Sequence, residues 1–128
     1  MPTARVSICN GTRARAPRAP FGAIKDAVLG KRYSLCLNWI GPGEMRKLNK
    51  IYRGKDKPTD ILSFPLSKTE GEIYICMSES RKQARAFGRA FENFVVFLFI
   101  HGCVHLKGYD HGATMEKLER RTRSKFGV

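Results

Sequence analysis

Acidic side chains are scarce in this 128-residue chain, which has 11 Asp and Glu against 24 Lys and Arg and a formal net charge of +13. A small domain needs a net charge of only about 2–8 to stay soluble. The excess therefore indicates a polyanionic partner, with nucleic acid favoured over an anionic membrane surface.

Long apolar segments are also missing. The longest apolar run, FVVFLFI at 94–100, is far short of the roughly 20 residues that cross a bilayer, so no membrane partner is expected. No apolar core of a secretory signal is visible near the N-terminus. The first 25 residues contain five basic residues and no acid, as organellar transit peptides do. However, RVSIC (5–9) alternates like a strand and favours a folded N-terminus, so we expect a cytoplasmic protein rather than one targeted to an organelle.

The four cysteines, Cys9, Cys36, Cys76 and Cys103, form no C-x-x-C pair. Each lies in or beside an apolar stretch, and a disulfide framework is not expected at this size and spacing. The pattern predicts reduced thiols in the core of a cytosolic protein.

Hydrophobic periodicity predicts one domain over residues 1–128, with an α/β (α+β) fold: a single sheet of about four strands packed with about five helices. The expected strands are 5–9, 32–40, 59–66 and 71–78, and the expected helices are 21–30, 44–54, 78–88, 90–108 and 114–126. Met45, Leu48, Ile51 and Tyr52 share one face of the second helix, and Ser78 is the expected N-cap of the third. A basic, proline-containing connector, TRARAPRAP, occupies 12–20.

All three histidines lie within HGCVHLKGYDH, residues 101–111. His101 and His105 are four apart on the expected 90–108 helix and so project within about 40° of each other. Gly108 ends that helix, which allows His111 to turn back as a third ligand. Three imidazoles suit Zn²⁺, although Cu, Ni or Fe fit the same set, and they leave one position open, as catalytic zinc requires.

A structural metal completed by a fourth side chain is the alternative. Cys103 is the nearest thiol, but it lies about 200° around the helix from His101 and is expected to face the core. Asp110 is expected to orient a ligand imidazole rather than to bind the metal. Gly102 stands where an H-E-x-x-H peptidase carries its general base, which argues against peptide hydrolysis.

A second dense stretch is YRGKDKPTDILSFP, residues 52–65. Arg53, Lys55 and Lys57 cluster beside a glycine and just before Pro58. A loop presenting them can bind phosphate, with the arginine offering a bidentate fork. The alternative is a solvated basic loop without a ligand.

Together, HGCVHLKGYDH and RGKDKPTDILSFP, with GEIYI between them, resemble the YbeY family of bacterial endoribonucleases over roughly residues 5–126. The resemblance implies a mixed sheet with a zinc site on the central helix and His101, His105 and His111 as ligands. It also implies that Arg53 and His101 are catalytic. The implied activity is cleavage of single-stranded RNA in 16S rRNA 3′-end maturation and ribosome quality control, with ribosomal RNA and the small subunit as partners.

This chain departs from the family pattern in having Val104 for Leu, Ile61 for Val and Glu72 for Asp, and its segment after the last histidine lacks the acidic stretch of relatives. Zinc can polarise a phosphoryl oxygen and acidify bound water. No general base is evident, and attack by water or by the RNA 2′-OH is open. Two other functions fit: a ribosome- or RNA-binding protein whose zinc only stabilises the fold, and a zinc hydrolase acting on a substrate other than RNA.

Overall fold

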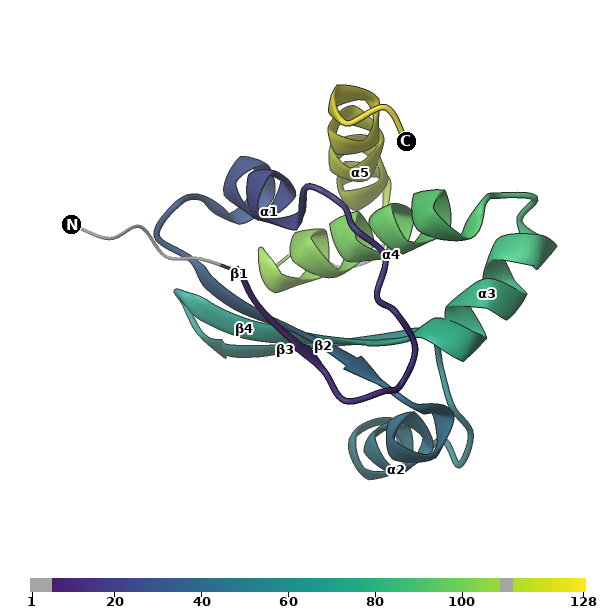
Figure 1. Ribbon diagram of the computed structural model, residues 1–128. Helices are drawn as coiled ribbons and strands as arrows, with labels where there is room; N and C mark the ends of the chain where they lie inside the picture. Colours follow the sequence, from purple (N-terminus) through teal and green to yellow (C-terminus); the bar gives the residue numbers. More distant parts are fainter. Residues whose placement is uncertain (1–5, 109–111) are drawn as a thin grey trace.

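The computed structural model describes residues 6–108 and 112–128. The elements run in the predicted order (Figure 1). They are β1 (Val6–Asn10), α1 (Phe21–Leu29), β2 (Ser34–Ile40), α2 (Pro42–Arg53), β3 (Ile61–Ser67), β4 (Glu70–Cys76), α3 (Met77–Ala86), α4 (Phe91–Leu106) and α5 (Ala113–Lys125).

The four strands form one mixed sheet in the order β1-β2-β4-β3. β2 pairs in parallel with both β1 and β4, and β3 runs antiparallel to β4 after a tight turn. The period of two places Leu35, Leu37 and Trp39 of β2 on one buried face. This arrangement makes β3 an edge strand, and the residues that precede it lie at the rim of the sheet.

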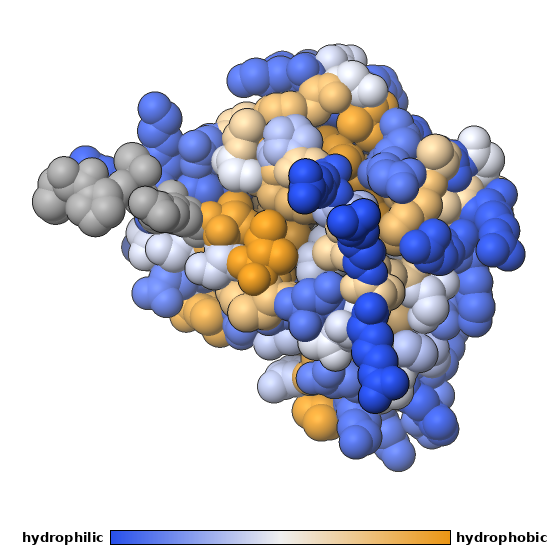
Figure 2. All heavy atoms as spheres, in the orientation of Figure 1, coloured by the Kyte–Doolittle hydropathy of each residue, from blue (hydrophilic) through white to orange (hydrophobic). Residues whose placement is uncertain are grey.

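Helix α4 crosses the main buried face of the sheet, with α1 and α5 packed against it (Figure 1). Ten of its sixteen residues are buried, as expected for a helix that is apolar on nearly all sides. Helix α2 covers part of the opposite face, where its Met45 packs with Leu62 of β3 and Cys76 of β4. Figure 2 shows hydrophilic and hydrophobic residues interspersed on the visible face, with a marked hydrophobic area where β1 lies.

Several local expectations need correction. Ile51 and Tyr52 are 71% and 62% exposed, because at the end of α2 the sheet offers only the Phe64 ring of its edge strand, which packs on Tyr52. Ser78 lies inside α3, which begins at Met77 directly after β4, and no side chain caps that helix. Cys76 and Cys103 are buried as expected, but Cys9 is exposed on the edge strand β1 and Cys36 is partly exposed.

Among the described residues, no single helix is long and apolar enough to cross a membrane. Only α3 and α4 taken together have the length and composition of a membrane span, and they meet at a bend of 104°.

Candidate metal and phosphate site

Two of the three predicted ligands lie on consecutive turns of α4. The imidazole rings of His101 and His105 are 4.6 Å apart between centroids and perpendicular to each other. Both side chains are partly exposed, whereas the neighbouring α4 residues Gly102, Cys103 and Val104 are buried. The helix therefore anchors the histidines rigidly while presenting both rings on its accessible side.

Gly102 brings this part of α4 close to the sheet. A Cβ at this position would lie 2.9 Å from Ile73 Cδ1, 2.9 Å from Ser63 Oγ and 3.1 Å from Ile61 Cδ1. Real Cβ atoms do not approach other atoms so closely, and a longer side chain has no space at all. A glutamate base of the peptidase kind is thus excluded by packing as well as by sequence.

A carboxylate from the last helix holds His101. The Nδ1 atom of His101 is hydrogen-bonded to Glu119 Oε1, and Glu119 is buried on α5. An imidazole that donates Nδ1–H to a carboxylate keeps its Nε2 lone pair available for a metal. Sequence analysis assigned this orienting role to Asp110, which lies outside the described residues, and it missed Glu119.

A second carboxylate that the sequence analysis missed, Asp60, lies where the chain enters β3. Its Oδ1 accepts a hydrogen bond from Thr59 Oγ1 at 3.4 Å, and its backbone oxygen accepts one from Cys76 N. Burial raises the pKa of Asp60 above its ordinary value, although local hydrogen bonds and the nearby His101 act in the opposite direction. Asp60 is therefore a carboxyl group with a stronger tendency to take up a proton than an exposed aspartate.

The basic loop after α2 is held in place by side chains of that helix. Gly54 ends the helix in the left-handed conformation, with φ 68°. Arg46 then forms a two-pronged contact with Asp56, at 2.8 and 3.1 Å, and Asn49 Nδ2 donates to the Lys57 carbonyl at 2.8 Å. This bracing fixes the loop that carries the predicted phosphate-binding residues.

Arg53 projects from the last turn of α2, where it is exposed and forms no ion pair within residues 6–108 and 112–128. It lines a pocket of about 350 Å³ together with Lys55 and Lys57. The predicted cluster of three basic side chains therefore exists, and its guanidinium group is accessible to an anion.

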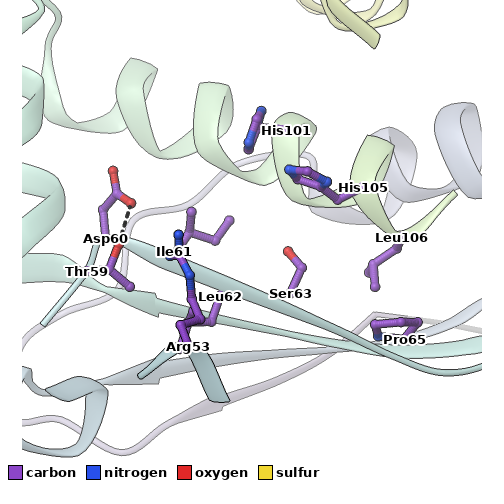
Figure 3. Close-up of a pocket in the computed structure, with 10 residues that line it drawn as sticks. All are labelled: Arg53, Thr59, Asp60, Ile61, Leu62, Ser63, Pro65, His101, His105 and Leu106. Carbon is purple, nitrogen blue, oxygen red and sulfur yellow. Dashed lines mark hydrogen bonds between the residues drawn. The ribbon is translucent and has the colours of Figure 1, made fainter. Parts of the chain in front are cut away.

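Arg53 also lines a neighbouring pocket of about 560 Å³, which we call the central pocket (Figure 3). Figure 3 shows the two imidazoles on α4 along one side of this pocket and residues of the α2–β3 region along the other. The lining residues are Arg53, Thr59, Asp60, Ile61, Leu62, Ser63, Pro65, His101, His105 and Leu106. The two motifs, nearly 50 residues apart in the sequence, thus meet in one cavity.

The donor set fits a transition metal in part. Within the described ranges 6–108 and 112–128, no three His, Cys, Asp or Glu side chains are close enough to hold one ion. His101 and His105 supply two imidazole nitrogens, and Cys103, fully buried in the core, faces away as predicted. A third donor must come from elsewhere, and the predicted one, His111, lies outside the described residues.

Comparison with known proteins gives consistent matches. The sequence profile of the family described as "Endoribonuclease YbeY" matches residues 21–126. A protein of that name from Caldanaerobacter subterraneus is 33% identical over 135 residues, covering 91% of this chain and 85% of the relative. A namesake from Halalkalibacterium halodurans is 37% identical over 95 residues, covering 62% of this chain and 60% of that relative.

Another namesake, from Aquifex aeolicus, is 49% identical over 74 residues, which is 49% of its length. The solution structure of TM1509 from Thermotoga maritima matches 95% of this chain and 89% of its own, with a TM-score of 0.69 and 26% identity. The fold expected from sequence, one mixed sheet of four strands with five helices, is confirmed by the architecture and by this structure.

Proposed function

This chain belongs to the YbeY family, and from that membership and the central pocket we propose that it is a metal-dependent endoribonuclease that cuts single-stranded RNA. The observation that carries the proposal is the meeting of Arg53, Asp60 and the His101–His105 pair in one cavity. The substrate we propose is the 3′ end of the small-subunit ribosomal RNA, in maturation and quality control of the ribosome. The net charge of +13 suits such a polyanion.

His101 and His105 would hold the metal, with His111 as the proposed third ligand, and zinc is the ion we propose. Once bound, the ion supplies positive charge that polarises the scissile phosphoryl group. Glu119 keeps the His101 ring in the orientation and tautomer that a metal requires. The chain's own part in this step is thus to present two neutral nitrogens on a rigid helix.

Arg53 would bind the nonbridging oxygens of the scissile phosphate. Its guanidinium group is exposed, forms no described ion pair and projects from the last turn of α2, next to the braced loop, so little rearrangement is needed on binding. Charge that develops on the phosphate in the transition state would strengthen this contact.

Asp60 would accept the proton of the attacking oxygen. It is the carboxylate that lines the central pocket among the described residues, and burial raises its pKa toward the range in which a general base is effective. The attacking oxygen whose proton Asp60 accepts could belong to water or to the adjacent 2′-OH. They give different products, because only attack by the 2′-OH leaves a 2′,3′-cyclic phosphate.

The test is cleavage of a 3′-extended rRNA fragment, with and without small ribosomal subunits, by the wild type and by His101→Ala and Arg53→Ala. Both variants should lose at least about a hundredfold in rate, since each removes a group that stabilises the transition state. Arg32→Ala, an exposed arginine in the turn before β2, should cut at the wild-type rate. Equal cutting by all four proteins would refute the proposal.

The same proteins distinguish the noncatalytic alternative. If the metal only stabilises the fold, EDTA lowers the melting temperature and the wild type binds RNA without cutting it. An enzyme instead loses cleavage in EDTA and regains it when zinc is restored.

A further inference from the structure

A second pocket, of about 360 Å³, adjoins the central pocket and shares Asp60, Ile61 and His101 with it. Its other walls come from the end of α3, the outer side of α4 and the start of α5. We call it the base pocket, and these walls consist of Phe87, Phe94, Phe97, Leu98, Gly112, Met115, Glu116 and Glu119. Its size is at the lower end of the range for small-molecule sites, roughly 300–1,000 Å³.

Three nearly parallel phenylalanine rings form one side of the base pocket. Phe87 and Phe94 stack with centroids 5.6 Å apart and planes at 20°, and Phe94 and Phe97 stack at 5.6 Å and 14°. Phe94 is 1% exposed, whereas Phe87 is 64% exposed. The stack is thus anchored in the core and ends in an accessible ring, a surface on which a planar group can stack.

The charges around these rings favour a nucleobase over a phosphate inside the pocket. The carboxyl groups of Asp60 and Glu116 line the pocket, and carboxylates accept hydrogen bonds from base amino groups but repel phosphates. The guanidinium groups of Arg89 and Arg123 lie 4.8 and 5.0 Å from the centre of the Phe97 ring. They supply positive charge beside the aromatic stack, where the sugar–phosphate chain of a bound strand would pass.

We propose that the base pocket binds one unpaired nucleobase that carries an exocyclic amino group, stacked on Phe87. The base belongs to the same strand whose phosphate lies at Arg53, because the two pockets adjoin and share Asp60, Ile61 and His101. The inference rests on the proposed function and deepens it, since a base can enter only if it is unpaired and free to leave its neighbours. Sequence preference near the cut would then arise from this chain's aromatic side chains and carboxylates.

The test measures binding without cleavage, in EDTA, by fluorescence anisotropy. The probes are RNA strands of about ten uridines, within the usual site size of single-strand binding modules, with a central guanosine, inosine or abasic nucleotide. The wild type should bind the guanosine strand most tightly and the abasic strand about tenfold more weakly, with inosine, which lacks the amino group, between them.

Phe87→Ala should bind all three strands alike, with an affinity close to that of the wild type for the abasic strand. Phe87→Trp, which keeps a ring at this exposed position, should preserve the discrimination. Ile8→Ala serves as a matched control, since Ile8 is 52% exposed on β1, at the opposite edge of the sheet from β3. It should behave as the wild type does.

The proposed base binding would be overturned if the wild type did not distinguish guanosine from an abasic site. It would also be overturned if Phe87→Ala still distinguished them. The first result is also the one expected if this aromatic surface docks another protein. If the protein cleaves RNA but does not discriminate between bases, only the proposed nucleobase binding is refuted. Discrimination without any cleavage refutes the endoribonuclease and leaves a base-binding site.

Discussion

Asp60 carries a negative charge that its surroundings disfavour. Burial raises its pKa in the folded chain above the ordinary value of 3.8. A raised folded pKa gives a stability contribution that is present at low pH and is lost as the pH rises through that pKa. Asp60→Asn should therefore be more stable than the wild type at pH 7, and the difference should shrink as the pH falls toward 4. Urea unfolding of metal-free protein at several pH values measures it.

Asp56 offers a control of the same residue type, because its pKa is shifted in the opposite direction. The hydrogen bond from Arg46 lowers the pKa of Asp56, so its contribution is present at neutral pH and is lost as the pH falls. Asp56→Asn should therefore be less stable than the wild type at pH 7. A stability loss at pH 7 in Asp60→Asn would show that the ionised carboxylate stabilises the fold and would contradict this account.

The residues of the site differed in how far the sequence could reveal them. His101, His105 and Arg53 lie in dense local motifs, and the spacing of four on a helix already places both imidazoles on one side. Glu119 lies 18 residues beyond His101 on another helix, so only the packing of α5 on α4 brings the two together. Asp60 lies inside the quoted motif, but its burial at the rim of the sheet is a tertiary property.

Among the secondary-structure elements, α4 and the sheet depend on a close approach at Gly102. Gly102→Ala would place a Cβ 2.9 Å from Ile73 Cδ1 and Ser63 Oγ, so these side chains, or the helix and strands that carry them, must shift. Overpacking of this kind costs about 1–3 kcal/mol in the free energy of unfolding, despite the better helix propensity of alanine. Chemical denaturation measures the loss, and displacement of the two histidines should also weaken the zinc binding that we propose.

Gly22→Ala in α1 is the control that separates the effect of overpacking from the effect of helix propensity. A Cβ there meets nothing within 4 Å, so the substitution should stabilise the chain by about 0.5–1 kcal/mol. A Gly102→Ala variant as stable as the wild type would mean that the sheet yields easily at this contact.

The order and type of all nine elements followed from hydrophobic periodicity and glycine positions, because most elements bury one face; the largely exposed strand β1 is the exception. The errors concern tertiary contacts and connections between elements, which hydrophobic periodicity does not reveal. At the end of α2 the sheet offers only the Phe64 ring of its edge strand, so Ile51 and most of Tyr52 are exposed, and α3 follows β4 so directly that Ser78 has no place at its cap.

Across the whole molecule, the basic connector at 12–20 adds a second positive region away from the central pocket. Its alanines Ala16 and Ala19 pack against the core, while Arg13, Arg15 and Arg18 are exposed. Two of these arginines line a shallow pocket with Arg81 on α3. The connector is therefore held on the surface with its charges outward, as a contact for the RNA backbone requires.

Replacing Arg13, Arg15 and Arg18 together by alanine should weaken RNA binding equally for all sequences and reduce its dependence on salt. Each phosphate contact on a single strand contributes about 0.7 to the slope of log K against log salt, so three lost contacts should lower the slope by about 2. Titrations at several salt concentrations measure this slope. The matched variant with three lysines keeps the charge and should keep the slope, because backbone contacts of this kind depend on charge rather than on guanidinium geometry. A slope that is unchanged in the alanine variant would mean that RNA does not reach the connector and that the strand is held by the pockets alone.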